Sequence, residues 1–236
     1  MKAKIYCRIV YVVGGKGGGG KSFCISLLNQ YLDSLSVKYR LYECDDETST
    51  TLRFYPETAK FLAIRSAAEI DHLVQTATEG KVEVVLVDLP ARAGDEFQNW
   101  FSIVPWDELA TLGVRFTSIG VVSGAKDSIE AILRWNEFVG SNVDHVLVLN
   151  RRDDLSIFES SNARDKFRLE GIPEIEIPKL DERFAAALDR ANWPISTALA
   201  SSEPHFLTQL MSRARLRRYR DQVFTQFETI KHLLIP

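Results

Sequence analysis

The sequence predicts a single α/β domain, residues 1–236, built on a doubly wound, mainly parallel sheet with helices on both faces. Two observations support this prediction. Short apolar runs alternate with longer amphipathic stretches, which is the pattern of strands and helices in turn. The runs are apolar at nearly every position, as in parallel strands that are buried on both faces. A chain of 236 residues is long enough to bury one core of ordinary size.

The first half of the chain is expected to supply three strands and three helices. The strands are expected at 5–13, 39–44 and 82–87, and the last of them is almost purely β-branched. The helices are expected at 21–35, 57–78 and 95–104, with a break allowed in the second. The segment EGK at 79–81 ends the second helix, and Pro105 ends the third because proline lacks the backbone N–H that a helix uses.

The second half continues the alternation. Strands are expected at 116–123, 143–149 and 172–177, and Pro178 stops the last of them. Helices are expected at 127–139, 156–169, 181–191 and 204–234, the final one open to interruption. The domain would therefore finish in a helical segment that covers about residues 203–234.

Composition and charge exclude several classes of protein. Apolar residues make up 45% of the chain and charged residues 26%, a composition typical of globular rather than disordered proteins. The formal net charge is −3, so any nucleic-acid binding needs a local basic patch. We expect no transmembrane helix and no signal peptide, since residues 1–4 lead directly into a strand. Cys7, Cys24 and Cys44 lack C-x-x-C spacing, which favours a reduced, cytoplasmic protein without disulfides.

A glycine-rich loop follows the first predicted strand and precedes the first predicted helix. Residues 14–22 are GGKGGGGKS, and the window 15–22 fits the phosphate-binding pattern G-x-x-x-x-G-K-[ST]. Glycines allow backbone N–H groups to turn toward phosphate oxygens, and the helix adds its positive N-terminal end. Lys21 would neutralise the β- and γ-phosphates, and the Ser22 hydroxyl would hold Mg²⁺. The alternative is a flexible glycine turn.

The segment KGGGGKS at 16–22 resembles the deviant Walker A motif, K-G-G-x-G-K-[ST], of the ParA/MinD family of ATPases. In that family the first lysine reaches across a dimer interface to the nucleotide of the other subunit. The resemblance therefore implies ATP or ADP binding, a homodimer on ATP binding, and a catalytic role for Lys16 beside Lys21. It implies a nucleotide contact for the residues Gly15, Lys16, Gly17, Gly18, Gly19, Gly20, Lys21, Ser22 and Phe23. A solvated loop cation is the alternative for Lys16.

Two acidic segments follow later strands. Asp88 ends the strand at 82–87, where phosphate-loop NTPases place the carboxylate that organises Mg²⁺; the alternative is a capped turn. The segment ECDDE at 43–47 resembles the switch I segment of the family, D-x-D-P-Q. Matched by position, Asp45 would orient the attacking water and lie near the metal, with the choice between Asp45 and Asp46 left open. The implied Mg²⁺ site is Ser22, Asp45 and Asp88.

Two further positions resemble the base-binding parts of the family. Asn150 follows the strand at 143–149, and its amide could donate to and accept from adenine. Pro178 follows the strand at 172–177, where the family lays a proline against the base. The alternatives are an Asn in a turn or helix cap and an ordinary strand end.

The last predicted helix carries a basic cluster and an apolar end. Within the cluster, Arg213, Arg217 and Arg220 would share one face, and Arg218 lies beside them. Members of the family bind non-specific DNA through late basic residues, and a solvated helix face is the alternative. The apolar residues at 227–234 are better explained by core packing than by membrane targeting.

The sequence is therefore predicted to be an ATPase, slow alone and stimulated by a partner, that acts as a dimerising switch. Its expected role is to position DNA cargo in plasmid partition or conjugative mobilisation, with an adaptor protein and a nucleoid- or plasmid-associated place in the cytoplasm. The alternatives are a MinD-like membrane-associated positioning ATPase and a metabolic ligase of the dethiobiotin-synthetase type.

Overall fold

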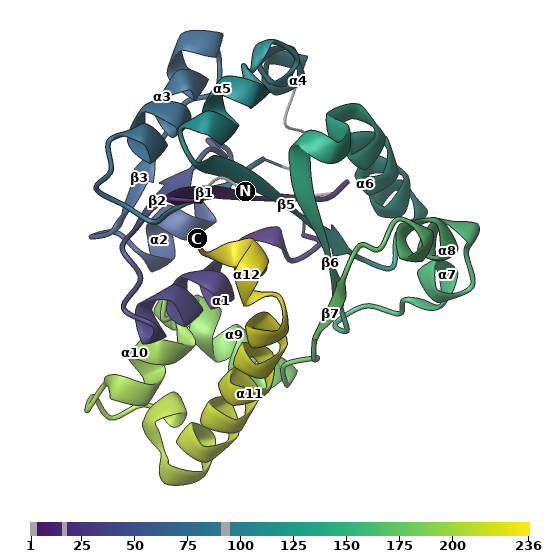
Figure 1. The fold of residues 1–236 in the computed structure, drawn as a ribbon. Helices are drawn as coiled ribbons and strands as arrows, with labels where there is room; N and C mark the ends of the chain where they lie inside the picture. The colour runs from purple at the N-terminus through teal and green to yellow at the C-terminus, as the bar shows by residue number, and fades with distance from the viewer. Residues whose placement is uncertain (1–3, 16–17, 91–94) are drawn as a thin grey trace.

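The computed structural model describes residues 4–15, 18–90 and 95–236. Over these ranges the chain forms one seven-stranded sheet in the order β3-β2-β4-β1-β5-β6-β7, with every pair of neighbours parallel (Figure 1). The strands are β1 Cys7–Val13, β2 Tyr39–Glu43, β3 Ala59–Phe61, β4 Val84–Asp88, β5 Val114–Val122, β6 Val143–Asn150 and β7 Glu174–Ile177. Parallel order brings the carboxyl ends of all these strands to one edge of the sheet.

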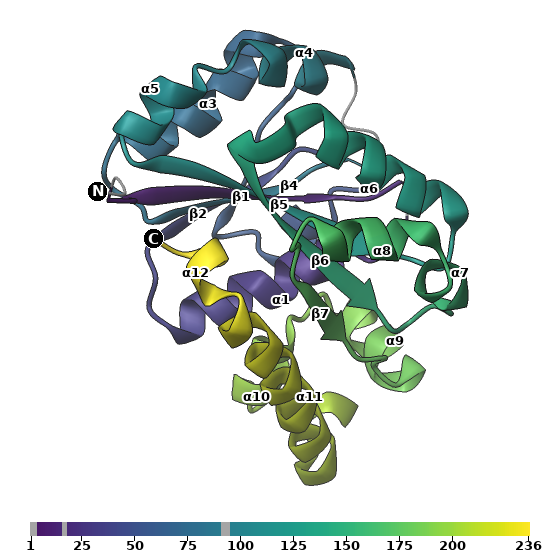
Figure 2. The same ribbon diagram turned by 45° about the vertical axis from the view of Figure 1, so that its right-hand side comes forward.

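Helices cover both faces of the sheet (Figures 1 and 2). One face is covered by α3 Ala67–Thr78, α4 Asp95–Ile103, α5 Trp106–Thr111 and α6 Lys126–Val139. The other face is covered by α1 Lys21–Ser34, α9 Glu182–Ala191, α10 Ile195–Ala200, α11 Leu210–Thr229 and α12 Lys231–Leu234. Three shorter helices lie at the edges of the sheet: α2 Thr50–Phe54, α7 Ser156–Glu159 and α8 Asn162–Leu169. The predicted α/β class is confirmed.

The central strands are buried on both faces, which explains why their sequences are largely apolar. In β1 the side chains of Ile9 and Tyr11 join the core under α4 and α6, whereas Val10 and Val12 join the core under α1. Successive residues of a strand point to opposite faces, so a strand between two helical layers is apolar at nearly every position. All three cysteines, Cys7, Cys24 and Cys44, are buried and none is in a disulfide.

The predicted helix at 57–78 is wrong in its first part. Residues 59–61 instead form β3, a three-residue strand whose Ala59 pairs with Leu41 of β2. Such a short strand is stabilised by pairing with its neighbour rather than by its own sequence, so periodicity cannot reveal it. The predicted helices at 156–169 and 204–234 are each divided. Before α11, a 3₁₀ turn at Phe206–Thr208 is capped by His205. Neither α2, α5 nor α10 was predicted.

The C-terminal end of the chain packs into the core, as the sequence analysis predicted. Phe227, Ile230 and Leu234 are all at most 2% exposed. The backbone of this segment is also tied to the sheet: the Thr117 hydroxyl donates to the Leu233 carbonyl at 2.5 Å, and Arg8 Nε donates to the Ile235 carbonyl at 3.3 Å. These residues are therefore not available as a separate membrane-binding face. In the part of the chain that the structure describes, no helix combines the length and apolar content needed to cross a bilayer.

Candidate functional site

The glycine loop lies between β1 and α1, at the carboxyl edge of the sheet. Its glycines are required by its geometry. Gly18 and Gly20 have φ values of 80° and 95°, in the left-handed region that side chains disfavour. A Cβ on Gly15 would lie 2.6 Å from the carbonyl oxygen of Asp127, at the start of α6. The predicted contacts of Lys16 and Gly17 lie outside the described residues.

Lys21 begins α1 and extends into the protein interior. It is only 8% exposed. Burial lowers the pKa of its ammonium group, and the nearby carboxylates of Asp88 and Asp45 act in the opposite direction. A partly desolvated cation under a glycine loop is well suited to contact phosphate oxygens, since a low local dielectric strengthens that attraction.

Asp88 ends β4, next to the loop, and is 1% exposed. Burial raises the pKa of its carboxyl, while Thr51, Ser22 and Lys21 each lower it. Its Oδ2 accepts a hydrogen bond from the Thr51 hydroxyl at 2.7 Å. Within the described residues its Oδ1 accepts none. A buried carboxylate oxygen left without a partner beside a serine hydroxyl is the arrangement that a Mg²⁺ ion and its waters would complete, so Ser22 and Asp88 fit the predicted metal site.

The structure separates Asp45 from Asp46. Asp45 caps the turn after β2, where its carboxylate accepts from the Glu47 N–H at 2.9 Å and from the Thr48 hydroxyl at 3.0 Å. It is also among the carboxylates that act on the pKa of Lys21. Asp46 is exposed and forms an ion pair with Arg65 at 3.1 Å. Of the two candidates, Asp45 is therefore the one whose charge reaches the glycine loop.

Glu43 was not expected to take part in the site. It is fully buried at the end of β2, opposite Asp88 of β4. Its carboxylate accepts from the N–H of Asp45 at 2.9 Å and from the N–H of Thr51 at 2.8 Å. Burial and the charge of Asp88 raise its pKa to about 7. The available sequence signal was the position of Glu43 at the start of the segment ECDDE, where the switch I motif has an aspartate; Thr51 gave no signal.

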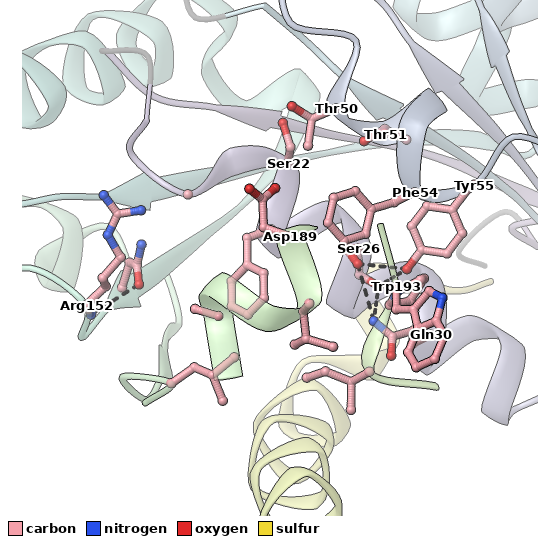
Figure 3. Close-up of a pocket in the computed structure, with 18 of the residues that line it drawn as sticks. Ser22, Ser26, Gln30, Thr50, Thr51, Phe54, Tyr55, Arg152, Asp189 and Trp193 are labelled. Atoms are coloured by element: carbon pink, nitrogen blue, oxygen red, sulfur yellow. Dashed lines mark hydrogen bonds between the residues drawn. The ribbon is translucent and has the colours of Figure 1, made fainter. Parts of the chain in front are cut away.

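A cavity of about 270 Å³ extends from the glycine loop along α1 (Figure 3). Its walls come from α1, from α2, from the α9–α10 segment and from the ends of β6 and β7. The predicted base-binding residues Asn150 and Pro178 both line it, and so does Phe23, which was predicted to contact the nucleotide. At the end away from the loop, the Ser26 hydroxyl is hydrogen-bonded to the Tyr55 hydroxyl and accepts from Gln30 Nε2.

Asn150 contacts the glycine loop itself. It is 5% exposed, and its Nδ2 donates to the Gly19 carbonyl at 3.0 Å. A Cβ on Gly20 would lie 2.4 Å from the same nitrogen. The end of β6 thus supports the phosphate loop as well as lining the cavity.

The structure divides the predicted basic cluster of α11. Arg213 donates to the Ser201 carbonyl at the end of α10, and Arg220 pairs with Asp221 at 2.8 Å. Arg217 and Arg218 are exposed. Of the three arginines predicted to share one face, only Arg217 is exposed, because Arg213 and Arg220 are bonded to neighbouring groups.

Comparisons with known proteins agree with this architecture. No protein-family model and no curated protein sequence matches the chain. Among solved structures, a chain of the MinC:MinD cell division protein complex of Aquifex aeolicus matches with a TM-score of 0.56 and 13% identity, over 93% of this chain and 96% of that one. A putative plasmid partition protein of Borrelia burgdorferi, bound to AMPPNP, matches with a TM-score of 0.51 and 12% identity, over 95% and 99%.

A third solved structure is an Archaeoglobus fulgidus nucleotide-binding protein in complex with ADP. It matches with a TM-score of 0.51 and 18% identity, over 80% of this chain and 87% of that one. Similarity at these identities establishes the fold. The chain therefore has the P-loop NTPase fold, and neighbours from MinD and plasmid partition proteins are consistent with the ParA/MinD resemblance of its sequence.

Proposed function

We propose that the chain is a ParA/MinD-type ATPase, a dimerising switch that hydrolyses ATP to position or segregate DNA cargo in plasmid partition or conjugative mobilisation. The observation that carries the proposal is that Lys21, at the start of α1, and Asp88, at the end of β4, are both buried beside the glycine loop, and that among the described residues Asp88 Oδ1 accepts no hydrogen bond. A cation for phosphate and an oxygen for a hydrated metal lie together at the N-terminal end of α1.

Each residue of the site would have a separate role in phosphoryl transfer. Backbone N–H groups of the loop and the Lys21 ammonium bind the phosphates, while Ser22 and Asp88 hold Mg²⁺. The metal supplies positive charge that offsets the charge developing on the phosphates. Asp45 orients the attacking water. Asn150, Pro178 and Phe23 enclose the adenine within the cavity.

The switch would work between two copies of the chain. Lys16 of each copy would contact the nucleotide of the other, so that ATP closes a dimer and hydrolysis releases it. The exposed Arg217 and Arg218 of the closed dimer would bind DNA phosphates. Two structural neighbours support this assignment, since one belongs to a complex with a partner protein and the other is described as a partition protein. We propose an adaptor that stimulates turnover and a cytoplasmic, plasmid- or nucleoid-associated protein.

Nucleotide binding and turnover test the proposal. We expect the wild-type chain to bind a fluorescent ATP analogue in the presence of Mg²⁺ and to release phosphate slowly. Lys21→Ala should lose both, because its ammonium is the buried cation under the loop. Lys60→Ala removes an exposed lysine from β3 and serves as the matched control. Equal binding by Lys21→Ala and Lys60→Ala would contradict the proposal.

The cavity favours one alternative function. A ligase of the dethiobiotin-synthetase type needs a site for a small molecule beside the phosphates. The cavity provides apolar space of this kind, bounded by Phe54, Leu188, Trp193 and Ile195. Phosphate release that requires a small-molecule co-substrate, and that is unchanged by DNA, would favour the ligase over the positioning ATPase.

A further inference from the structure

Three side chains connect the switch I segment to Asp88. Glu43 and Asp88 are direct partners in the register of β2 and β4, and both stand at the carboxyl ends of their strands. Thr51, in the first turn of α2, lies between them: its N–H donates to Glu43 at 2.8 Å and its hydroxyl donates to Asp88 at 2.7 Å. All three residues are buried. A hydrogen-bonded chain therefore runs from β2 through α2 to β4.

Glu43 holds both ends of the loop that contains Asp45. One carboxylate oxygen, Oε1, accepts from the Asp45 N–H, and the other, Oε2, accepts from the Thr51 N–H. Backbone donors six residues apart are thus fixed by one side chain whose own position is set by the sheet. Burying a carboxyl is unfavourable unless it is hydrogen-bonded, and these two bonds offset that cost.

Thr51 sets the orientation of the Asp88 carboxylate. With Oδ2 held by the Thr51 hydroxyl, rotation of the carboxylate is restricted, and Oδ1 is the oxygen without a hydrogen bond among the described residues. Partners of this kind orient a group that contacts a metal, and their loss typically lowers metal affinity by about 10- to 100-fold.

We propose that Glu43 and Thr51 are positioning residues for Mg²⁺-nucleotide binding: Thr51 aims Asp88, and Glu43 places both Thr51 and the Asp45 loop. The inference rests on the proposed function and specifies how its metal site is assembled. It makes α2 part of the site although α2 carries no residue that contacts phosphate in the proposal. It also predicts that loss of the Thr51 hydroxyl weakens nucleotide binding only when Mg²⁺ is present. Binding of nucleotide without metal relies on the loop and Lys21.

The first experiment uses Thr51→Val, which keeps the shape of the side chain and removes its hydroxyl. A fluorescent ADP analogue is held at fixed concentration, and binding to the full chain is followed as Mg²⁺ is added. We expect Thr51→Val to need about 10-fold more Mg²⁺ for half-maximal effect, while its affinity for the analogue in EDTA stays at the wild-type value. Thr51→Ser, which keeps the hydroxyl, should restore the Mg²⁺ response. Thr78→Val is the control, because that hydroxyl donates only within α3.

The second experiment needs neither metal nor nucleotide. In Glu43→Gln one carboxylate oxygen is replaced by an NH₂ group, which cannot accept a hydrogen bond from a backbone N–H. Because the remaining oxygen can still accept one of the two bonds, we expect amide hydrogen exchange at residue 45 or at residue 51 to become faster than in the wild type, whereas exchange in α3 is unchanged. This measurement also tests the positioning role of Glu43 if Thr51→Val fails to fold.

The outcomes separate the inference from the function on which it rests. If the wild-type chain binds no nucleotide with or without Mg²⁺, the proposed function fails. If the wild type responds to Mg²⁺ and Thr51→Val has the same midpoint, or if Glu43→Gln leaves amide exchange at residues 45 and 51 unchanged, the positioning role is overturned while the ATPase proposal stands.

Discussion

The amide nitrogen of Asn150 lies 3.0 Å from the carbonyl oxygen of Gly19, so the end of β6 is hydrogen-bonded to the phosphate loop. The loop is therefore held from three directions. Asn150 contacts it from β6, the start of α6 packs against Gly15, and Lys21 anchors it through α1. This close packing makes the loop sensitive to single methyl groups.

Gly20→Ala is the sharpest test of that packing. The added Cβ would lie 2.4 Å from Asn150 Nδ2, and a φ of 95° would be strained for alanine by about 1–3 kcal/mol. We expect nucleotide binding to be lost in a titration with a fluorescent ATP analogue. Gly80→Ala is the control, since its φ of 70° is similarly strained and open space surrounds the Cβ. Binding by Gly20→Ala at the wild-type level would show that the loop adapts.

The exposed arginines of α11 are expected to carry DNA binding. We expect the double variant Arg217→Glu/Arg218→Glu to lose ATP-dependent binding of duplex DNA, measured by fluorescence anisotropy at several salt concentrations. Each phosphate contact contributes about 0.9 to the slope of log affinity against log salt, so the two lost contacts should lower the slope by about 2 for each copy of the chain that contacts DNA.

A charge-matched control separates local contact from net charge. Arg134→Glu/Arg168→Glu changes the total charge equally but alters α6 and α8, away from α11 (Figure 2). We expect this control to retain most of the binding. Equal loss in both double variants would exclude a specific role for α11.

The packed C-terminal segment should contribute to folding stability. Leu234 is 1% exposed, and its truncation to alanine should lower the free energy of unfolding by about 2–5 kcal/mol, since it leaves a cavity in the core. Leu210→Ala removes the same atoms from a side chain that is 82% exposed and should change stability by less than about 0.5 kcal/mol. Urea unfolding measures both, and equal stability of the two variants would be inconsistent with core packing of the tail.

Much of the fold could be predicted because it is encoded locally. Apart from Arg8 and Asp88, the strands β1 and β4 are apolar throughout, and the glycine loop between β1 and α1 has a spacing that few other structures require. Asp88 could be placed in the site because parallel strands bring their carboxyl ends to one edge.

The remainder depends on contacts between distant segments. The strand β3 exists through its pairing with β2, and Thr51 enters the site only because α2 brings its hydroxyl to Asp88 at the end of β4. Arg213 could not be separated from Arg217 by helical spacing alone, since its partner is the Ser201 carbonyl of another helix. The cavity likewise forms only where α1, α2 and α9 come together, so the sequence of no single helix predicts it.

The molecular mass of the chain with and without nucleotide tests the dimerising switch most directly. Light scattering would be recorded with no nucleotide, with ADP-Mg²⁺, with ATP-Mg²⁺ for Asp45→Ala, and with a non-hydrolysable ATP analogue for the wild type. Lys16→Ala would be measured beside Lys60→Ala as its control. We predict twice the mass of the chain only with ATP or its analogue. We also predict that Lys16→Ala loses this dimer and that Lys60→Ala keeps it. A single-chain mass under every condition, or a dimer that Lys16→Ala leaves intact, would contradict the account.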